Sequence, residues 1–217
     1  MFDAATRLAI AHESRLACAC KRCQAAKLAL LPNADLGPAL AHHDHGGELS
    51  EGLTEIVHRI RTDAARITAD WVEHRARKVV SDGEYVEVIA IIATVMAVDG
   101  FCHALSLPLH HLPAPREGMP SRRTPTRAKR QLAWVPTLAP GEHDAGATDP
   151  YRDVSGIHIH QALSLVPDEA VAFFELDAAQ YLPDAALRDY AHEYRELSHA
   201  QIEFLAARVS ALNQCVY

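Results

Sequence analysis

Proline is distributed very unevenly along this chain of 217 residues. Eight of its twelve prolines lie between residues 107 and 155. Proline lacks a backbone N–H and interrupts helices and sheets, so this stretch predicts an extended, irregular connection. A loop of that length in a compact protein is usually functional or wraps a neighbouring part. The prolines therefore divide the chain into residues 1–106, an irregular linker 107–155, and residues 156–217.

The parts on either side of the linker carry helix signals. Ala and Leu dominate over Val, Ile and Thr, which favours helices over sheets. Ser81 and Glu84 have the spacing of a capping box, as do Ser198 and Gln201. Ser50 precedes apolar residues at spacings of three and four, as an N-cap does. These signals predict an all-α protein.

Further local elements are expected within residues 156–217. His158 and His160 alternate with apolar residues, which predicts a short extended stretch. Pro167 suits the first position of a helix. A further helix is expected to start at Pro183 or Asp184.

Charge and hydropathy exclude some classes of protein. The formal charge of −7 argues against a general nucleic-acid binder, and the basic stretch 116–130 is expected to be a solvated loop. The longest apolar run, residues 88–98, is too short to span a bilayer and predicts a buried helix, not a membrane segment. The first residues lack the layout of a secretory signal. We therefore expect a cytoplasmic protein.

Five cysteines bear on the chemistry, and three of them are crowded together. They are Cys18, Cys20, Cys23, Cys102 and Cys215. An odd, clustered set does not indicate a secreted disulfide framework; in a reducing compartment it favours redox chemistry or metal binding. Cys102, within the apolar helix, is expected to be a core residue.

The complete Cys-x-x-Cys of the chain is Cys20-Lys-Arg-Cys23. Lys21 and Arg22 would favour thiolates electrostatically, so we expect a redox pair. Two other interpretations stay open, an inert pair and a zinc site, since thiolate and imidazole are the ligands that zinc prefers. The candidate zinc ligands are Cys18, Cys20 and Cys23 with His42, His43 or His45.

The C-terminal stretch from Ser198 carries a second cysteine pattern. Its predicted buried side consists of Phe204, Leu205, Val209 and Leu212. Asn213 would cap a new helix whose first turn holds Cys215, where the helix dipole stabilises a thiolate. Glu203 lies roughly 18 Å from Cys215 on a straight helix, so the two could cooperate only if the chain bends at Asn213.

This stretch resembles the AhpD-like alkylhydroperoxidase / carboxymuconolactone decarboxylase family. Members carry Glu, eleven residues, Cys-x-x-Cys, and His four positions later. Glu203 and Cys215 match the first two elements, but the printed sequence ends at Tyr217, one residue before the second cysteine is due. Residues 81–105 are similar to the family more loosely. The resemblance implies an all-α bundle with two related halves joined by the Pro-rich loop, and a homo-oligomer.

The resemblance also implies an activity, thiol-dependent reduction of a small-molecule peroxide. It assigns Cys20 and Cys23 as the redox pair, Cys215 as a resolving thiol and Glu203 as its proton relay. The reductant would be a protein or small thiol of unknown identity, and no cofactor, metal, nucleic acid or membrane is expected. The rival hypotheses are a catalytically silent scaffold of the same fold and a Cys/His zinc-binding interaction module.

The N-terminal cysteine pair departs from the family pattern. Aligned on Cys215, it has Leu8 where the relay Glu belongs and Lys27 where the His belongs. Glu13 or His12 could take that role only in a different geometry.

Overall fold

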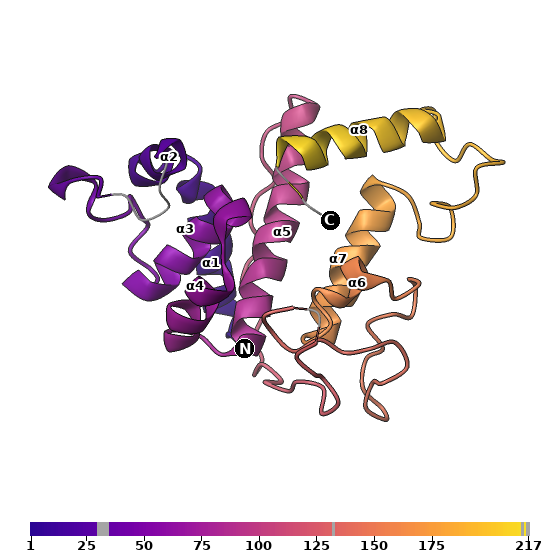
Figure 1. Ribbon diagram of the computed structural model, residues 1–217, viewed down its shortest axis with the longest axis horizontal. Helices are drawn as coiled ribbons and strands as arrows, with labels where there is room; N and C mark the ends of the chain where they lie inside the picture. Colours follow the sequence, from indigo (N-terminus) through magenta and orange to yellow (C-terminus); the bar gives the residue numbers. More distant parts are fainter. Residues whose placement is uncertain (30–34, 132, 214, 216–217) are drawn as a thin grey trace.

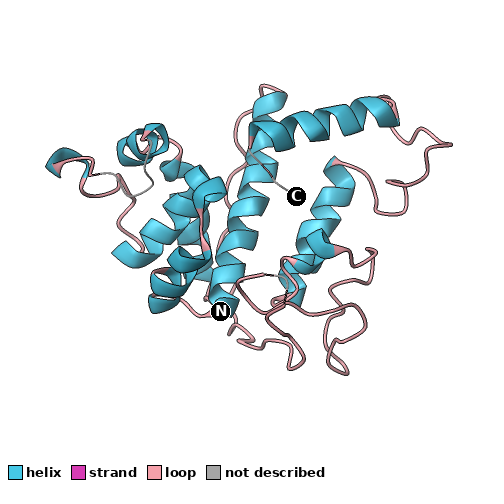
Figure 2. Ribbon diagram, viewed as in Figure 1, coloured by secondary structure: helices cyan, strands magenta, loops and turns pink. Residues whose placement is uncertain are grey.

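The structure, a computed structural model, describes residues 1–29, 35–131, 133–213 and 215. Within these residues it is helical and contains no strand; one isolated antiparallel bridge joins Lys129 and Thr137 (Figure 2). The prediction of an all-α protein is confirmed. The α-helices are α1 (Ala4–Ala17), α2 (Lys21–Leu28), α3 (Glu51–Asp63), α4 (Ala69–His74), α5 (Asp82–Ala104), α6 (His158–Gln161), α7 (Pro167–Gln180) and α8 (His199–Leu212) (Figure 1).

Side-chain caps set where several helices begin. The Ser50 hydroxyl accepts the N–H of Leu53 at the start of α3. Both predicted capping boxes are present, at the starts of α5 and α8. Because each cap pairs an amide that the helix itself leaves unpaired, these starts could be predicted from sequence.

The core is built around α5, the long helix at the centre of Figure 1, which packs on α1, α3 and α7. By length and composition α5 could cross a membrane, but half of its most apolar stretch is buried inside the protein. Its two buried carboxylates are ion-paired with α1, Glu87 with Arg7 and Asp99 with Arg15. Helix α5 is therefore a core helix, as the apolar run of residues 88–98 predicts. Cys102 is buried on it, as expected.

Two local predictions are wrong. His158 and His160 lie in the short helix α6, not in an extended stretch, because the chain closes a turn from the His160 N–H to the Ile157 carbonyl. The chain from Pro183 forms turns and no helix, since the Asp184 carboxylate accepts the Ser155 N–H of the linker instead of capping a helix. The linker 107–155 is irregular, as predicted, in all of its described residues.

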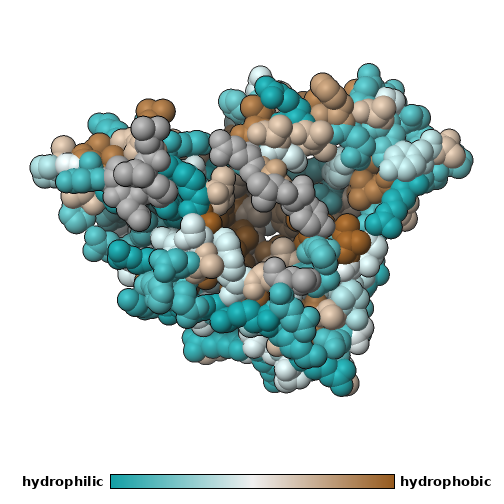
Figure 3. Space-filling view, viewed as in Figure 1, coloured by the Kyte–Doolittle hydropathy of each residue, from teal (hydrophilic) through white to brown (hydrophobic). Residues whose placement is uncertain are grey.

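Helix α8 is also placed differently from the prediction. Its expected buried side is exposed: Phe204 is 72% accessible, and Leu205, Val209 and Leu212 are more than half accessible. The physical reason is that α8 crosses one end of the molecule, with no helix packed extensively on it in the described part of the chain (Figure 1). Apolar side chains consequently lie at the surface over α8 (Figure 3).

A candidate zinc site between the N-terminal helices

The turn between α1 and α2 brings two thiols together. Helix α1 ends at Ala17, and the Cys20 N–H bonds to the Ala17 carbonyl. Cys20 is then the N-cap of α2, and Cys23 is the third residue of that helix. Both side chains are buried, and both are free thiols. The two cysteines of the predicted pair thus lie on the same side of the first turn of α2.

Two imidazoles close over these thiols from other parts of the chain. His43 comes from the loop before α3, and His58 is fully buried on α3. The Nδ1 atom of His43 lies 3.6 Å from Sγ of Cys20 and 3.4 Å from Sγ of Cys23. The Nδ1 atom of His58 lies 3.1 Å from Sγ of Cys23. The four atoms, two sulfurs and two nitrogens, all lie within 4.8 Å of one another.

A carboxylate contacts the outer nitrogen of each imidazole. Nε2 of His58 lies 2.7 Å from Oε1 of Glu13, which is 2% exposed on α1. Nε2 of His43 lies 2.6 Å from Oε2 of Glu55 on α3. In metal sites, a carboxylate in this position keeps the proton on Nε2 and leaves the Nδ1 lone pair for the metal.

Further hydrogen bonds hold the loop that carries His43. The Lys21 N–H, at the start of α2, donates to Asp44 over 3.0 Å. The Arg22 guanidinium donates to the Leu40 carbonyl, and the Gly46 N–H donates to Glu13 over 3.0 Å. Glu13 therefore holds both a ring nitrogen of the site and the loop backbone.

Electrostatics differ between the two imidazoles. Burial disfavours the charged form of His43, but its bonds to Cys23, Glu55 and Cys20 outweigh burial and raise the pKa of His43 to about 10. Burial dominates at His58 and lowers its pKa, which favours a neutral ring. At Cys20, burial is outweighed by the Cys23 and Asp44 amides and the His43 side chain, and the thiol pKa is lowered. Without a metal, the site therefore favours a protonated His43 beside the Cys20 thiolate, and a metal that binds Nδ1 of His43 would displace its proton.

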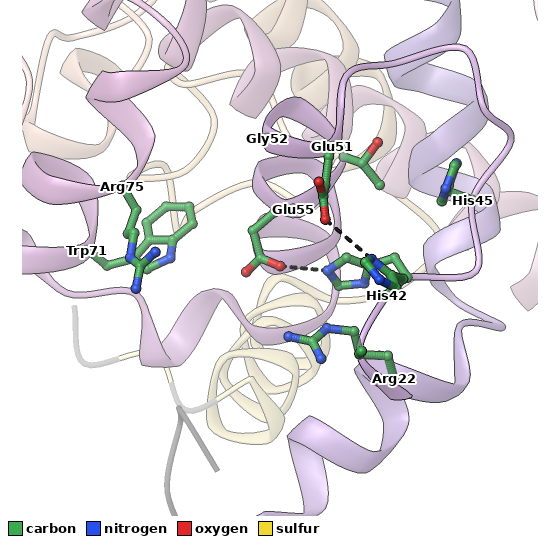
Figure 4. A pocket seen from close by; sticks show the side chains of 11 residues that line it. Arg22, His42, His45, Glu51, Gly52, Glu55, Trp71 and Arg75 are labelled. Carbon is green, nitrogen blue, oxygen red and sulfur yellow. Dashed lines mark hydrogen bonds and ion pairs between the residues drawn. The ribbon is translucent and has the colours of Figure 1, made fainter. Parts of the chain in front are cut away.

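A cavity of about 660 Å³ lies beside the cluster on the His43 side. Glu55, bonded to the imidazole of His43, and His42, paired with Glu51, line it, as Figure 4 shows. Trp71 and Arg75 form its far wall. The cavity gives solvent, and a small ion, a path to the imidazole.

The donor set fits zinc. Tetrahedral zinc with Zn–S of about 2.3 Å and Zn–N of about 2.0–2.1 Å separates sulfur from nitrogen by about 3.5 Å. The three measured S···N separations, 3.1 to 3.6 Å, lie close to that value. The two carboxylates supply the outer bonds that zinc-binding histidines usually make.

The other candidate ligands lie elsewhere. Cys18 is exposed, and its Sγ contacts the Ser14 carbonyl. His42 and His45 are exposed in the loop, with His42 paired to Glu51. Of the three histidines named from the sequence, the structure brings His43 to the thiols.

The C-terminal candidates form a separate region. Glu203 is partly exposed on α8, accepts a hydrogen bond from the Tyr181 hydroxyl and lies 3.6 Å from Nε2 of the buried His199. Asn213 is the C-cap of α8, and the Cys215 N–H bonds back to the Ser210 carbonyl. The prediction that Cys215 lies in a first helical turn is therefore wrong, because Cys215 follows the C-terminus of α8. Residues 214 and 216–217, also assigned to that second helix, lie outside the described residues.

Sequence reasoning missed His58, Glu55 and the role of Glu13. A signal was available: Glu55 and His58 are three apart on α3, among residues that otherwise bury an apolar face. A buried charged residue on α1 needs a partner, and His58 is that partner for Glu13. The distance of 45 residues between them hides this pairing in the sequence.

Comparison of the chain with protein-family models, with curated proteins and with solved structures gave no match. What can be said of its function therefore depends on the geometry of the cluster.

Proposed function

We propose that this protein binds one zinc ion through Cys20, Cys23, His43 and His58. The observation that carries the proposal is the convergence of four donor atoms within 4.8 Å, with both imidazoles backed by carboxylates. Two thiolates neutralise the charge of the ion, and the set matches the Cys₂His₂ class of zinc site.

The proposed role of the ion is structural. Four protein donors fill a tetrahedral shell and leave no position for a substrate. The ion would join the α1–α2 turn, the loop of His43 and α3, three segments brought together across 38 residues of sequence. A reducing compartment, such as the cytoplasm, suits a site that needs two thiolates.

Metal analysis of the purified full-length protein tests this proposal. We expect one zinc per chain in the parent protein and in Cys18→Ser, the matched control from the same turn. We expect none in Cys23→Ser. Cobalt substitution supplies a second readout, because tetrahedral thiolate-bound Co²⁺ absorbs strongly in the visible and near-ultraviolet range. A parent protein that takes up neither metal after reduction would refute the proposal.

A second candidate function is the thiol-dependent peroxidase chemistry that the AhpD-like resemblance implies. The observation that favours it is the chain of contacts from Cys23 through His58 to Glu13, with distances of 3.1 and 2.7 Å. One thiolate would attack the O–O bond of the peroxide, giving a sulfenic acid and releasing an alcohol. The second thiol would then attack the sulfenic acid sulfur, forming the Cys20–Cys23 disulfide and releasing water. An external dithiol would then reduce the disulfide.

Peroxide consumption separates the two candidates. Steady-state turnover with a dithiol reductant is measured for the parent and Cys215→Ser, each with and without bound zinc, and for Cys23→Ser without zinc. If the site is a structural zinc centre, the zinc-loaded parent shows no turnover. Turnover that is lost in Cys23→Ser and kept in Cys215→Ser would favour the peroxidase. The reverse pattern would point instead to the region of Glu203 and Cys215.

A further inference from the structure

A second cavity, separate from the zinc site, lies between α1 and α5. Its volume is about 550 Å³, within the range of about 300–1,000 Å³ typical of small-molecule pockets. Leu8 and Ala11 of α1, Ile91 and Val95 of α5, and Leu112 of the linker line it. The space is therefore lined mainly by apolar side chains.

Residues 110–116 of the linker form a strap over this cavity, and α7 contributes to its wall. Between residues 108 and 124 the described chain makes no backbone–backbone hydrogen bond. The strap is held instead by contacts such as that of the Arg15 guanidinium, which donates to the His110 carbonyl over 2.8 Å. A segment held in this way can be displaced by a ligand at little cost in backbone hydrogen bonds.

The charged groups around the cavity are mostly satisfied. Arg15 makes a bidentate pair with Asp99, at 2.7 and 2.9 Å. Arg7 is paired with both Glu87 and Glu169. Arg116, at the end of the strap, is exposed and has no ion-pair partner among the residues that the structure describes. The cavity thus combines an apolar interior with a guanidinium, that of Arg116, which no described residue pairs.

We infer that this cavity binds a free fatty acid of medium chain length. The alkyl chain lies between α1 and α5 under the strap, and the carboxylate pairs with Arg116. Residues 4–15 of α1, which line the cavity at intervals, span about 16 Å along the helix axis, so an extended chain fits along it. An arginine–carboxylate pair at the rim gives orientation, and the buried chain gives most of the affinity.

Titration of the full-length protein with dodecanoate, below its micelle concentration, tests the inference. We expect saturable 1:1 binding that weakens about fourfold for each methylene removed, so decanoate should bind about fifteenfold more weakly. Thr94→Trp, an exposed residue of α5 that lines the cavity, should weaken binding at least tenfold. Met96→Trp, exposed on the same helix and outside the cavity, should not.

The head group is tested with dodecanol and two arginine variants. Arg116→Ala should reduce dodecanoate affinity to that of dodecanol and leave dodecanol binding unchanged, whereas Arg123→Ala, outside the cavity, should change neither. Unaltered binding in Thr94→Trp, with folding confirmed by circular dichroism, would overturn the site. Ala172→Trp, on the facing helix α7, gives an independent test of the same volume. Equal binding of acid and alcohol to the parent would overturn the carboxylate assignment. A dimer that dissociates in Thr94→Trp would show that a second copy is the occupant and would also overturn it.

Discussion

The two cysteine-bearing ends of this chain place their thiols in opposite environments. Cys20 and Cys23 begin a helix, are buried, and face two imidazoles. Cys215 follows the end of a helix and is exposed. A helix start offers unpaired N–H groups that stabilise a thiolate, and a helix end offers carbonyls that do not. The comparison teaches that the cysteine pattern alone does not determine which groups surround a cysteine, because the end of the helix that it occupies and its burial also decide them.

The same contrast extends to packing. The N-terminal region up to α5 shares one apolar cluster with residues 163–170, whereas α8 leaves its apolar side chains at the surface. Burial surrounds Cys20 and Cys23 with fixed partners, whereas the exposed Cys215 has no comparable set among the residues that the structure describes.

Removal of the metal should produce the largest difference between the two ends. A ligand that binds only the folded state, at a free concentration a thousandfold above its Kd, stabilises it by about 4 kcal/mol. We expect Cys23→Ser to lose bound zinc and at least that much of the free energy of unfolding, measured in urea with buffered zinc. Cys215→Ser should keep both. Equal losses in the two variants would remove the distinction drawn here.

Core truncation should show the next largest effect. Ile92 of α5 is 1% exposed, so Ile92→Ala should cost about 2–5 kcal/mol of the free energy of unfolding. Phe204→Ala on α8 should change it by less than about 0.5 kcal/mol, because the side chain is already in solvent. Urea unfolding of the zinc-loaded proteins measures both. A large loss in Phe204→Ala would mean that α8 is covered in solution.

Part of the contrast between the N-terminal region and α8 could be predicted from the sequence. Local signals predicted the helix starts at Ser50, Ser81 and Ser198, because a cap and its partner lie within three residues. The apolar pattern predicted the buried helix that became α5. The same kind of pattern failed at α8, since amphipathic spacing shows that a helix has an apolar side and not whether another element covers it.

The site was only partly predictable. Cys-x-x-Cys pointed to Cys20 and Cys23, and the His-rich loop made His43 one of three choices. His42 and His45 lie in the same loop but outside the cluster, because the path of the loop directs His43 to the thiols. Hydrogen bonds to Asp44, Gly46 and Leu40 hold the loop in this path, and the sequence does not show them. Glu13 and His58 are joined by packing of α1 on α3, which no local pattern encodes.

The carboxylates behind the imidazoles provide a finer test. Glu13→Gln keeps the shape of the side chain and removes the charge that orients His58, so zinc affinity should fall 10- to 100-fold. Competition with a chromophoric chelator measures the change. Glu203→Gln, the corresponding change on α8, should leave the affinity unaltered. A fall of similar size in both variants would show that the effect comes from net charge and not from the contact with His58.

The smallest expected effect concerns two tyrosines at alkaline pH. Tyr85 of α5 is 6% exposed, and burial raises the pKa of its hydroxyl from 10.0 to about 12. A group whose pKa is raised in the folded state contributes stability that is present below the unfolded value, here 10, and is lost as the pH rises through about 12. At pH 11 the loss amounts to about 1.4 kcal/mol. Phenylalanine at position 85 cannot ionise, so Tyr85→Phe does not suffer this loss. Between pH 8 and pH 11, the free energy of unfolding of Tyr85→Phe should therefore rise by that amount relative to the parent.

Tyr190→Phe is the matched control, because Tyr190 lies in the C-terminal region and is 77% exposed. Its difference from the parent should stay constant over the same range. Using differences between variants cancels the titration of the lysines and the remaining tyrosines, which all three proteins share. A constant difference for Tyr85→Phe as well would mean that the Tyr85 hydroxyl is hydrated in solution. Water would then reach the core helix α5, and the N-terminal region would be less tightly packed than its contrast with the exposed C-terminal region implies.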